Sequence, residues 1–240
     1  MRKILRQTCF VIILGQKLSP MRLMFYFIVL AAFFSCKKDT ANIATPEEIV
    51  SYKVILTTAW MSPAFTIPAG AHFTIVAGMV HSKDTFLWSN RPATLGLENV
   101  AEVGNVIRMN QELDSMILNH KALSRFAVPA PGINSSIEFP LTFTSSFSCI
   151  SFASMVAPSP DWFTGINNYC LIQNSKWVDD VTVNLYVHDA GTEDGDIFGY
   201  DNPATVPAQN VSLLSAINAT VLANGNPVLG KIATVRFIKN

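Results

Sequence analysis

The chain has 240 residues, of which 50% are hydrophobic and 14% are charged. This is enough apolar material to bury the core of one domain of ordinary size, so we do not expect disorder over the bulk of the chain. The formal net charge is zero, but the five basic residues before position 36 are accompanied by no acidic residue there. From Cys36 onward, 12 basic minus 17 acidic residues leave a net charge of −5. Because no stretch of Lys and Arg mixed with aromatic residues is present, we expect no nucleic-acid partner.

Residues 21–39, MRLMFYFIVLAAFFSCKKD, have the pattern of a targeting segment, with a basic start and an apolar run over residues 23–34. This run is shorter than the ~20 apolar residues that span a bilayer. Its length fits the apolar core of a secretion signal. We therefore predict that residues 1–35 are a signal segment, with Met21 as an alternative start of the chain.

Cys36 follows the apolar run directly and is preceded by the small residue Ser35. This arrangement resembles the lipobox of bacterial lipoproteins, although Phe33 and Phe34 are bulkier than that pattern usually has. The resemblance implies that Cys36 carries a lipid, so that the protein contacts a membrane of the cell envelope, at the outer membrane or the cell surface. Residues 36–49 would then be the lipidated cysteine and a flexible tether. A plain secretory signal with a chance cysteine and a single anchor helix stay open as alternatives.

Export would place the two cysteines of the mature chain, Cys149 and Cys170, in an oxidising setting. Both lie in stretches with strand character, FSCISF and NYCLIQ. A disulfide between them and two buried free thiols are both compatible with the sequence.

Short runs rich in Val, Ile, Thr and aromatic residues, separated by Gly, Pro, Asn and Asp, predict strands along most of the chain. Within one of them, residues 181–187, apolar and polar residues alternate with a period of two, which is typical of a half-buried antiparallel strand. In the last run, Ala233, Val235 and Phe237 share one face, and we expect this strand to complete the sheet. The predicted strands cover residues 52–60, 71–81, 135–143, 147–157, 180–190 and 230–240.

One helix is predicted over residues 105–124, where apolar residues including Ile107 and Leu113 recur at roughly helical spacing. Asn105 is a suitable N-cap residue, and a shorter turn is expected over residues 96–104. No internal repeat or linker interrupts residues 50–240. The pattern therefore predicts a mainly β protein with a single antiparallel β-sandwich and one helical insertion.

Two acidic segments stand out, APSPDWFTG with Asp161 and HDAGTEDGD over residues 188–196. Acids at strand ends are either solvated turn residues, which cap their own loop backbone, or oxygen ligands of a hard cation. Calcium takes about 6 to 8 oxygen ligands, and glycines such as Gly191 and Gly195 let a loop curl around an ion. The segment is not an EF-hand, because the third position counted from Asp189 is Gly191.

Several motifs in a fixed order resemble the spondin domain, which occurs at the N-terminal side of F-spondin and in bacterial surface proteins. The resemblance covers roughly residues 50–240. Any one motif alone would be weak, but the ordered set is specific. The matching stretches are YKVILTTAW, PAGAHFTIVAGMVHSKDTFLW, GLENVAEVG, APSPDWFTG, SKWV, HDAGTEDG and NPATVP.

This resemblance implies an antiparallel β-sandwich similar to C2 domains, a bound Ca²⁺ ion, and extracellular binding or adhesion rather than catalysis. The calcium carboxylates of the family fall here on Asp161, Asp189 and Glu193. The family usually has Asp at the position of Glu193, so Asp194 next to it is an alternative ligand.

The aromatic residues and histidines near these motifs have structural interpretations. Trp162 and Phe163 are expected to pack against the core rather than form an exposed recognition pair. The four histidines lack zinc-type spacing. We expect His72 to be a hydrogen-bonded structural residue, and His188 to support its neighbour Asp189.

These observations favour a cell-envelope module that binds calcium and an unidentified extracellular protein or glycan. Nucleophile and nucleotide motifs are absent from the sequence, which favours a protein that is not an enzyme. Two alternatives stay open. One is a carbohydrate-active envelope enzyme with Asp161 and Asp189 as its carboxylate pair, and the other is a purely structural lipoprotein.

Overall fold

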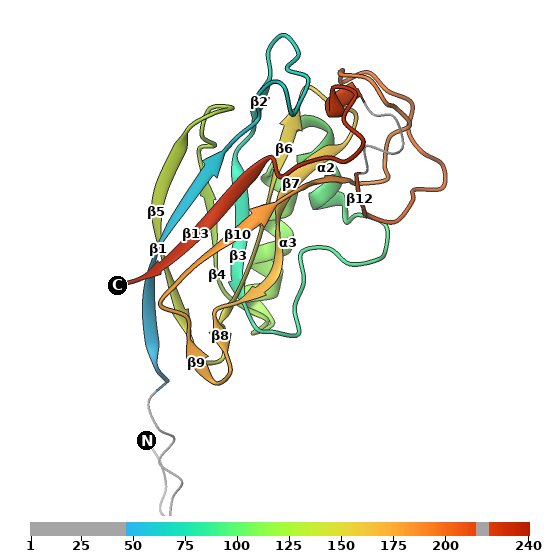
Figure 1. Ribbon diagram of the computed structural model, residues 1–240. Helices are drawn as coiled ribbons and strands as arrows, with labels where there is room; N and C mark the ends of the chain where they lie inside the picture. Colours follow the sequence, from blue (N-terminus) through green and yellow to red (C-terminus); the bar gives the residue numbers. More distant parts are fainter. Residues whose placement is uncertain (1–46, 215–220) are drawn as a thin grey trace, which may run out of the picture. The chain divides into compact units, whose positions relative to one another are not determined.

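Antiparallel strands dominate the structure, a computed structural model that describes residues 47–214 and 221–240 (Figure 1). Residues Pro46–Asn240 form one compact unit. The predicted signal segment, Cys36 and the tether up to residue 46 lie outside the described residues. Within the described part of the chain, no helix is long and apolar enough to cross a membrane.

The smaller sheet has four strands, and each pairs with its neighbours in antiparallel fashion. Along β1, every second residue is buried, from Val50 to Leu56, so one face of this sheet lies on the core. The order of the strands is β10 (Asp180–Leu185), β13 (Ala233–Lys239), β1 (Ile49–Thr58) and β5 (Ser136–Thr144).

The larger sheet packs against the smaller one to form the sandwich. Short β2 (His72–Phe73) pairs with its central strand β6, and the hairpin of β8 (Ile172–Gln173) and β9 (Lys176–Trp177) stands apart. The order of the main strands is β12 (Ser212–Leu213), β11 (Val187–Asp189), β7 (Trp162–Cys170), β6 (Cys149–Ala157), β3 (Val76–His81) and β4 (Ala122–Val128).

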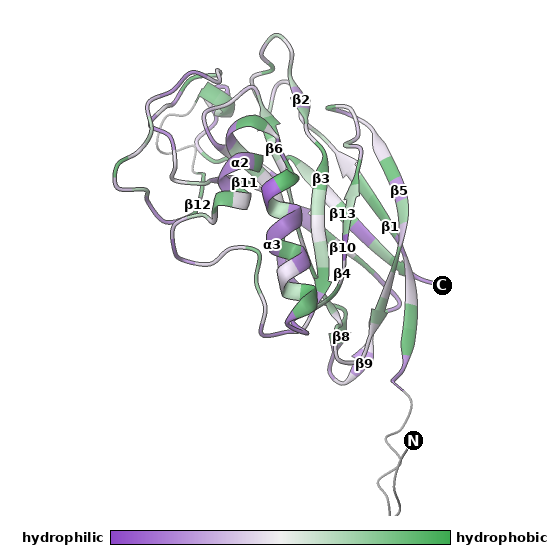
Figure 2. Ribbon diagram, turned by 180° about the vertical axis from the view of Figure 1, so that it is seen from behind, coloured by the Kyte–Doolittle hydropathy of each residue, from purple (hydrophilic) through white to green (hydrophobic). Residues whose placement is uncertain are grey.

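Two helices, α2 (Leu95–Val103) and α3 (Ile107–Leu118), cover the outer face of the larger sheet, as Figure 2 shows. Leu97 of α2 and Met109 of α3 pack with Met79 of β3 in this outer core. All nine residues of β6 are buried because the smaller sheet covers one face of the strand and the helices cover the other. A short 3₁₀ helix, η2 (Val221–Ala223), also contributes to the inner core.

The mainly β sandwich predicted from the sequence is confirmed, but its helical part differs from the prediction. The expected turn over residues 96–104 is the helix α2, which ends at Gly104 in the left-handed conformation (φ +67°). The predicted helix over residues 105–124 ends at Leu118, and its last residues belong to β4. Asn105 is not the N-cap, which is Val106, but its Oδ1 accepts a hydrogen bond from the backbone N–H of Ile107 at 2.9 Å.

The predicted strand over residues 180–190 divides between the two sheets. Leu185 pairs with Ala233 in the smaller sheet, whereas Val187 pairs with Thr164 in the larger one. The chain therefore crosses from one sheet to the other at Tyr186, whose carbonyl accepts a hydrogen bond from Thr164 Oγ1 at 2.9 Å.

The two cysteines of the described chain lie opposite each other on neighbouring strands. Cys149 begins β6 and Cys170 ends β7, and the two residues are register partners. A disulfide joins them in the structure. It links the ends of two central strands at the end of the sandwich where β1 begins, because Ile49 of β1 pairs with Thr144, shortly before β6.

Candidate metal centre

Asp161 lies at the opposite end of β6, in the connection to β7. The two residues after it are fully buried on opposite faces of the larger sheet, Trp162 in the inner core and Phe163 in the outer core. The hydroxyl of Ser159 accepts a hydrogen bond from the backbone N–H of Trp162 at 3.2 Å and so closes the turn. Both aromatic rings therefore anchor the loop, as expected from the sequence, and Asp161 is itself 0% exposed.

The two oxygens of the Asp161 carboxylate differ in their hydrogen-bond partners. Oδ2 accepts hydrogen bonds from the backbone N–H groups of Thr192 (2.7 Å) and Glu193 (3.1 Å) and from the Thr192 hydroxyl (3.3 Å). Oδ1 is buried and has no hydrogen-bond partner among the described residues. Burial raises the pKa of Asp161, and the hydrogen bonds to Oδ2 oppose this rise. A buried oxygen without a partner is costly, which makes Oδ1 a candidate ligand atom.

The second acidic segment curls over Asp161 because of Gly191. The backbone N–H of Ala190 donates to the Asp161 carbonyl at 3.1 Å, and the N–H of Gly191 donates to Asp189 Oδ1 at 2.7 Å. Gly191 has a φ of +74°, and a side chain there would collide with the backbone carbonyl of Gln209. Only glycine suits this position. The Gln209 N–H donates to the Gly191 carbonyl at 2.7 Å and so keeps the two backbones close together.

Asp189 and Glu193 both have raised pKa values in this setting. Burial raises the pKa of Asp189 to about 6, and the nearby charges of Asp161 and Asp194 add to the effect. Burial likewise raises the pKa of Glu193 to about 7, followed by the charge of Glu102 and then that of Asp161. Asp161 is thus close enough to both Asp189 and Glu193 for its charge to disfavour their ionised forms.

Glu102 also lies near these acids, and the sequence analysis did not identify it. It lies half-buried near the end of α2, where burial raises its pKa and the nearby charges of Glu98 and Asp161 add to the rise. Thr74 holds this end of the helix, because it contacts Gly104 and its Oγ1 accepts a hydrogen bond from the Met155 N–H at 3.1 Å.

A sequence signal for Glu102 exists in the spacing of the two acids of α2. Glu98 and Glu102 are four residues apart, so a helix over residues 95–103 places both on the same side. The interpretation of this stretch as a turn concealed that pattern. We call Asp161, Asp189, Glu193 and Glu102 the carboxylate cluster.

Asp194, the alternative to Glu193, points to a different partner. Its Oδ1 accepts a hydrogen bond from the hydroxyl of Thr205 at 2.6 Å, and the residue is exposed. Glu193 is half-buried, and its Oε2 accepts a hydrogen bond from Asn202 at 3.4 Å. Glu193 is thus the residue that lies beside Glu102 and Asp161.

The cluster has no salt-bridge partner among the described residues. The sequence has no Lys or Arg from residue 177 to residue 230, although seven acidic residues lie in that range. The salt bridges formed within the described residues do not include Asp161, Asp189, Glu193 or Glu102.

The side chains of the carboxylate cluster fit a metal ion in their chemistry but not yet in their arrangement. In residues 47–214 and 221–240, no three His, Cys, Asp or Glu side chains already stand in a metal-binding arrangement. The chemistry of the cluster nevertheless suits a hard cation, because it offers carboxylate oxygens, including the unpartnered Oδ1 of Asp161. Binding would require a movement of side chains, which the half-buried Asp189 and Glu193 permit.

The histidines next to the cluster are structural. His188 stacks on Phe163 with a ring distance of 5.3 Å and meets the edge of Trp88 at 5.4 Å. Burial lowers the pKa of His188, so the ring is neutral at neutral pH, and its Nδ1 has no partner among the described residues. It precedes Asp189 in β11, so its packing fixes the strand that positions this acid. His72 is hydrogen-bonded through Nδ1 to the Gly70 carbonyl at 2.7 Å.

Fold and site together define the class of the protein: an antiparallel β-sandwich module whose loops gather carboxylates at one end. The Spondin_N family model matches residues 50–222. The chain therefore belongs to the spondin N-terminal domain family, as the ordered motifs indicate.

Relatives in animals agree with this assignment. Spondin-2 of Rattus norvegicus is 30% identical over 213 residues, which cover 82% of this chain and 64% of the rat protein. Human Spondin-2 is 28% identical over 193 residues, 76% of this chain and 58% of the relative. Human Spondin-1 is 29% identical over 174 residues, 68% of this chain but 21% of the relative. The chain thus spans less than two thirds of the length of each of these proteins.

Proposed function

We propose that this chain is an exported, calcium-binding β-sandwich module that binds an extracellular partner and does not act as an enzyme. The observation that carries the calcium proposal is Asp161, a fully buried carboxylate with one unpartnered oxygen beside further carboxylates. A divalent cation would supply the positive charge that the segment from residue 177 to residue 230 lacks. The ligands would be Asp161 Oδ1 together with Asp189 and Glu193, completed by other oxygen atoms.

Binding would also order the loops. Asp161 already fastens the Thr192–Glu193 backbone through Oδ2, so an ion on Oδ1 and Glu193 would hold the same loop from a second side. Because such an ion binds the folded state, it would stabilise the fold by linkage. Extracellular calcium modules often have dissociation constants of about 0.1 to 1 mM.

The calcium proposal is tested by thermal unfolding of the full chain in millimolar calcium and in chelator. We expect calcium to raise the melting temperature, and Asp161→Asn combined with Asp189→Asn to abolish the rise. Asp84→Asn, which changes an exposed acid outside the cluster, should keep the rise and serves as the matched control. Identical melting temperatures of the wild-type protein in calcium and in chelator would show that the proposal is wrong.

A binding role has more support than the glycosidase alternative. The raised pKa values of Asp189 and Glu193 resemble those of catalytic acids. Asp161, however, is 0% exposed, so a glycan could not contact it without opening the loop. Hydrolysis of a glycan panel that is insensitive to chelator but lost in Asp161→Asn would favour the enzyme instead.

Export is supported by the other end of the sandwich. The Cys149–Cys170 disulfide suits an oxidising compartment. The described chain begins at this end, because Glu47 accepts a hydrogen bond from the Ser146 N–H at 2.7 Å. The nine residues of β6 separate this end from the carboxylate cluster, a length of about 30 Å.

A lipid on Cys36 would therefore leave the cluster far from the point where the tether joins the domain. Cys36→Ser should release the protein from membranes into the soluble fraction. Unchanged membrane retention would count against lipidation.

A further inference from the structure

The loop after Glu193 exposes two large apolar side chains to solvent. Ile197 is 59% exposed and Tyr200 is 51% exposed. Phe198, between them, points inward and packs against Trp162 (ring distance 5.9 Å) and Trp60 (6.5 Å). The loop is thus fixed to the core by one aromatic ring, while the side chains on either side of that ring are left in solvent. We call residues 196–201 the distal loop.

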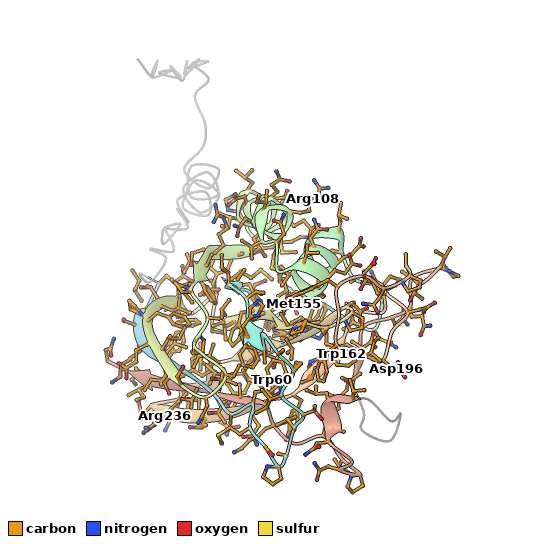
Figure 3. The ribbon with its side chains drawn as sticks, turned by 90° about the horizontal axis from the view of Figure 1, so that it is seen from above. Trp60, Arg108, Met155, Trp162, Asp196 and Arg236 are labelled. Atoms are coloured by element: carbon orange, nitrogen blue, oxygen red, sulfur yellow. A yellow bond between two sulfur atoms is a disulfide. The ribbon has the colours of Figure 1, made fainter. Side chains whose placement is uncertain are left out.

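Acidic residues border these apolar side chains. Asp196 and Asp201 are both exposed, and neither takes part in a side-chain hydrogen bond or ion pair within the described residues. Figure 3 shows Asp196 at the outer edge of the molecule, beyond the buried Trp162. The distal loop therefore exposes two carboxylates, unpaired within the described part of the chain, next to two large apolar side chains.

We propose that the distal loop is a docking surface for a cationic segment of an extracellular protein. Lys or Arg side chains of that segment would pair with Asp196 and Asp201, and an apolar side chain between them would pack on Ile197 and Tyr200. The proposal names the partner chemistry of the binding role proposed above and rests on that role. Neither Asp196 nor Asp201 is among the proposed calcium ligands, although the charge of Asp201 adds to the rise in the pKa of Glu193.

The negative charge of the distal loop favours a cationic protein segment over the other possible binding partners. An anionic bilayer or a nucleic acid would be repelled, because the chain has no Lys or Arg between residues 177 and 230. A second copy docking through the same loop would bring Asp196 and Asp201 against like charges. A neutral glycan would leave both carboxylates without partners. A cationic protein segment satisfies the charges and the apolar side chains together, with the aromatic Tyr200 as its main anchor.

The position of the distal loop suits such a partner. The loop follows Glu193 and therefore lies at the cluster end of the sandwich, about 30 Å along β6 from the end where the described chain begins. The opposite end offers an internal comparison, because the turn after β3 also exposes an acid and an aromatic residue, Asp84 and Phe86. Lys83 stands next to Asp84 there, whereas the distal loop has no neighbouring base.

The test selects a random dodecapeptide library, displayed on phage, on the full chain purified in detergent. Enriched peptides should carry net positive charge together with aromatic or branched apolar residues. Their dissociation constants, measured by fluorescence anisotropy, should rise tenfold or more for the double variant Asp196→Asn, Tyr200→Ser. They should also rise with increasing salt. The matched double variant Asp84→Asn, Phe86→Ser should bind the same peptides unchanged.

Other outcomes overturn the proposal. Enrichment of neutral or acidic peptides would do so, as would equal losses in both double variants. Loop-dependent binding to phosphatidylglycerol vesicles, or self-association that Tyr200→Ser abolishes, would assign the surface to a membrane or to a second copy. All binding is measured in calcium and in chelator. Peptide binding without a calcium effect on melting would reject the calcium proposal alone, and a calcium effect without selected cationic peptides would reject this inference alone.

Discussion

Acids paired with basic residues occur at one end of the sandwich, and acids with raised pKa values occur at the other end. At the end that carries the disulfide, two acids of the smaller sheet pair with bases: Asp180 with Arg236 at 2.5 Å, and Asp179 with Lys239 at 2.6 Å. Side-chain hydrogen bonding to Arg236 lowers the pKa of Asp180. At the other end, burial and mutual repulsion raise the pKa values of Asp189 and Glu193.

This difference separates acids that stabilise the fold by themselves from acids that need an additional positive charge. The paired acids lie on strands and face basic residues across the sheet, as Asp180 and Arg236 do. The carboxylate cluster lies in loops and at the ends of β11 and α2, and Asp189 and Glu193 belong to a segment without basic residues. A fold that only required stability would gain by replacing these acids, so their presence favours a functional interpretation.

The largest expected effect tests the disulfide end. Replacement of both Cys149 and Cys170 by Ala should lower the free energy of unfolding by about 3 kcal/mol, because the disulfide closes a loop with a sequence separation of 21 residues. Urea denaturation measures the change. The rise in melting temperature caused by calcium should persist in this variant. If it disappears, the two ends are coupled and the comparison between them fails.

The next effect concerns the loop of the cluster end. Gly191→Ala should destabilise the protein by about 2 kcal/mol, because Ala is strained at a φ of +74° and its side chain would collide with the Gln209 carbonyl. Gly70→Ala is the matched control, since Gly70 has the same φ but open space around it. It should cost about 1 kcal/mol from the backbone strain alone. Equal losses in the two variants would mean that the contact with Gln209 has no energetic role.

The sequence predicted the strands well wherever burial follows a simple pattern. Alternation over residues 181–187 identified the strand β10, and the run over residues 147–157 contains β6. The prediction failed where local patterns conflict with tertiary contacts. The helical spacing before Leu118 extended into β4, and the motif with Asp161 concealed that β7 begins at Trp162.

The candidate site was predicted only in part. Asp161, Asp189 and Glu193 came from the resemblance to the spondin domain, and their role as calcium ligands stays a prediction; the structure shows Asp161 near each of the other two. The Glu98–Glu102 spacing could have indicated an acidic helix face, but not that Glu102 lies near Asp161, because this depends on how α2 packs against β6 and β7. The same holds for Asp161 Oδ1, since the lack of a partner is a property of the folded loop and not of the motif.

A variant of Glu102 tests, with a smaller expected effect, whether this residue belongs to the calcium site. Glu102→Gln should weaken calcium binding about tenfold in isothermal titration calorimetry, because the variant removes one negative charge next to Glu193 while it keeps the size of the side chain. Glu98→Gln, one turn earlier on α2, is the control and should leave the affinity within about twofold. Equal affinities of the two variants would confine the site to the loop acids.

The smallest expected effect is the dependence of stability on pH in chelator. The pKa of Asp189 is about 6 in the folded protein, above its ordinary value of 3.8, so the folded state binds more protons than the unfolded state between these values. The stability that Asp189 contributes is therefore complete below about pH 4 and lost as the pH rises through about 6. Glu193 extends the loss to about pH 7. Asp180, whose pKa is lowered, acts in the opposite direction and at more acidic pH.

Asp189→Asn should therefore reduce the loss of stability between pH 4 and pH 7 by on the order of 1 kcal/mol, since the amide stays neutral and can still accept the Gly191 hydrogen bond. Asp180→Asn should leave the slope in this range unchanged. Urea denaturation at closely spaced pH values measures both variants. In the wild-type protein, the stabilisation by calcium should grow over the same range, because the ion binds ionised carboxylates and competes with protons for them. If Asp189→Asn leaves the slope unchanged, the acids of the cluster are as well satisfied as those at the disulfide end, and they would then give no reason to expect a cation.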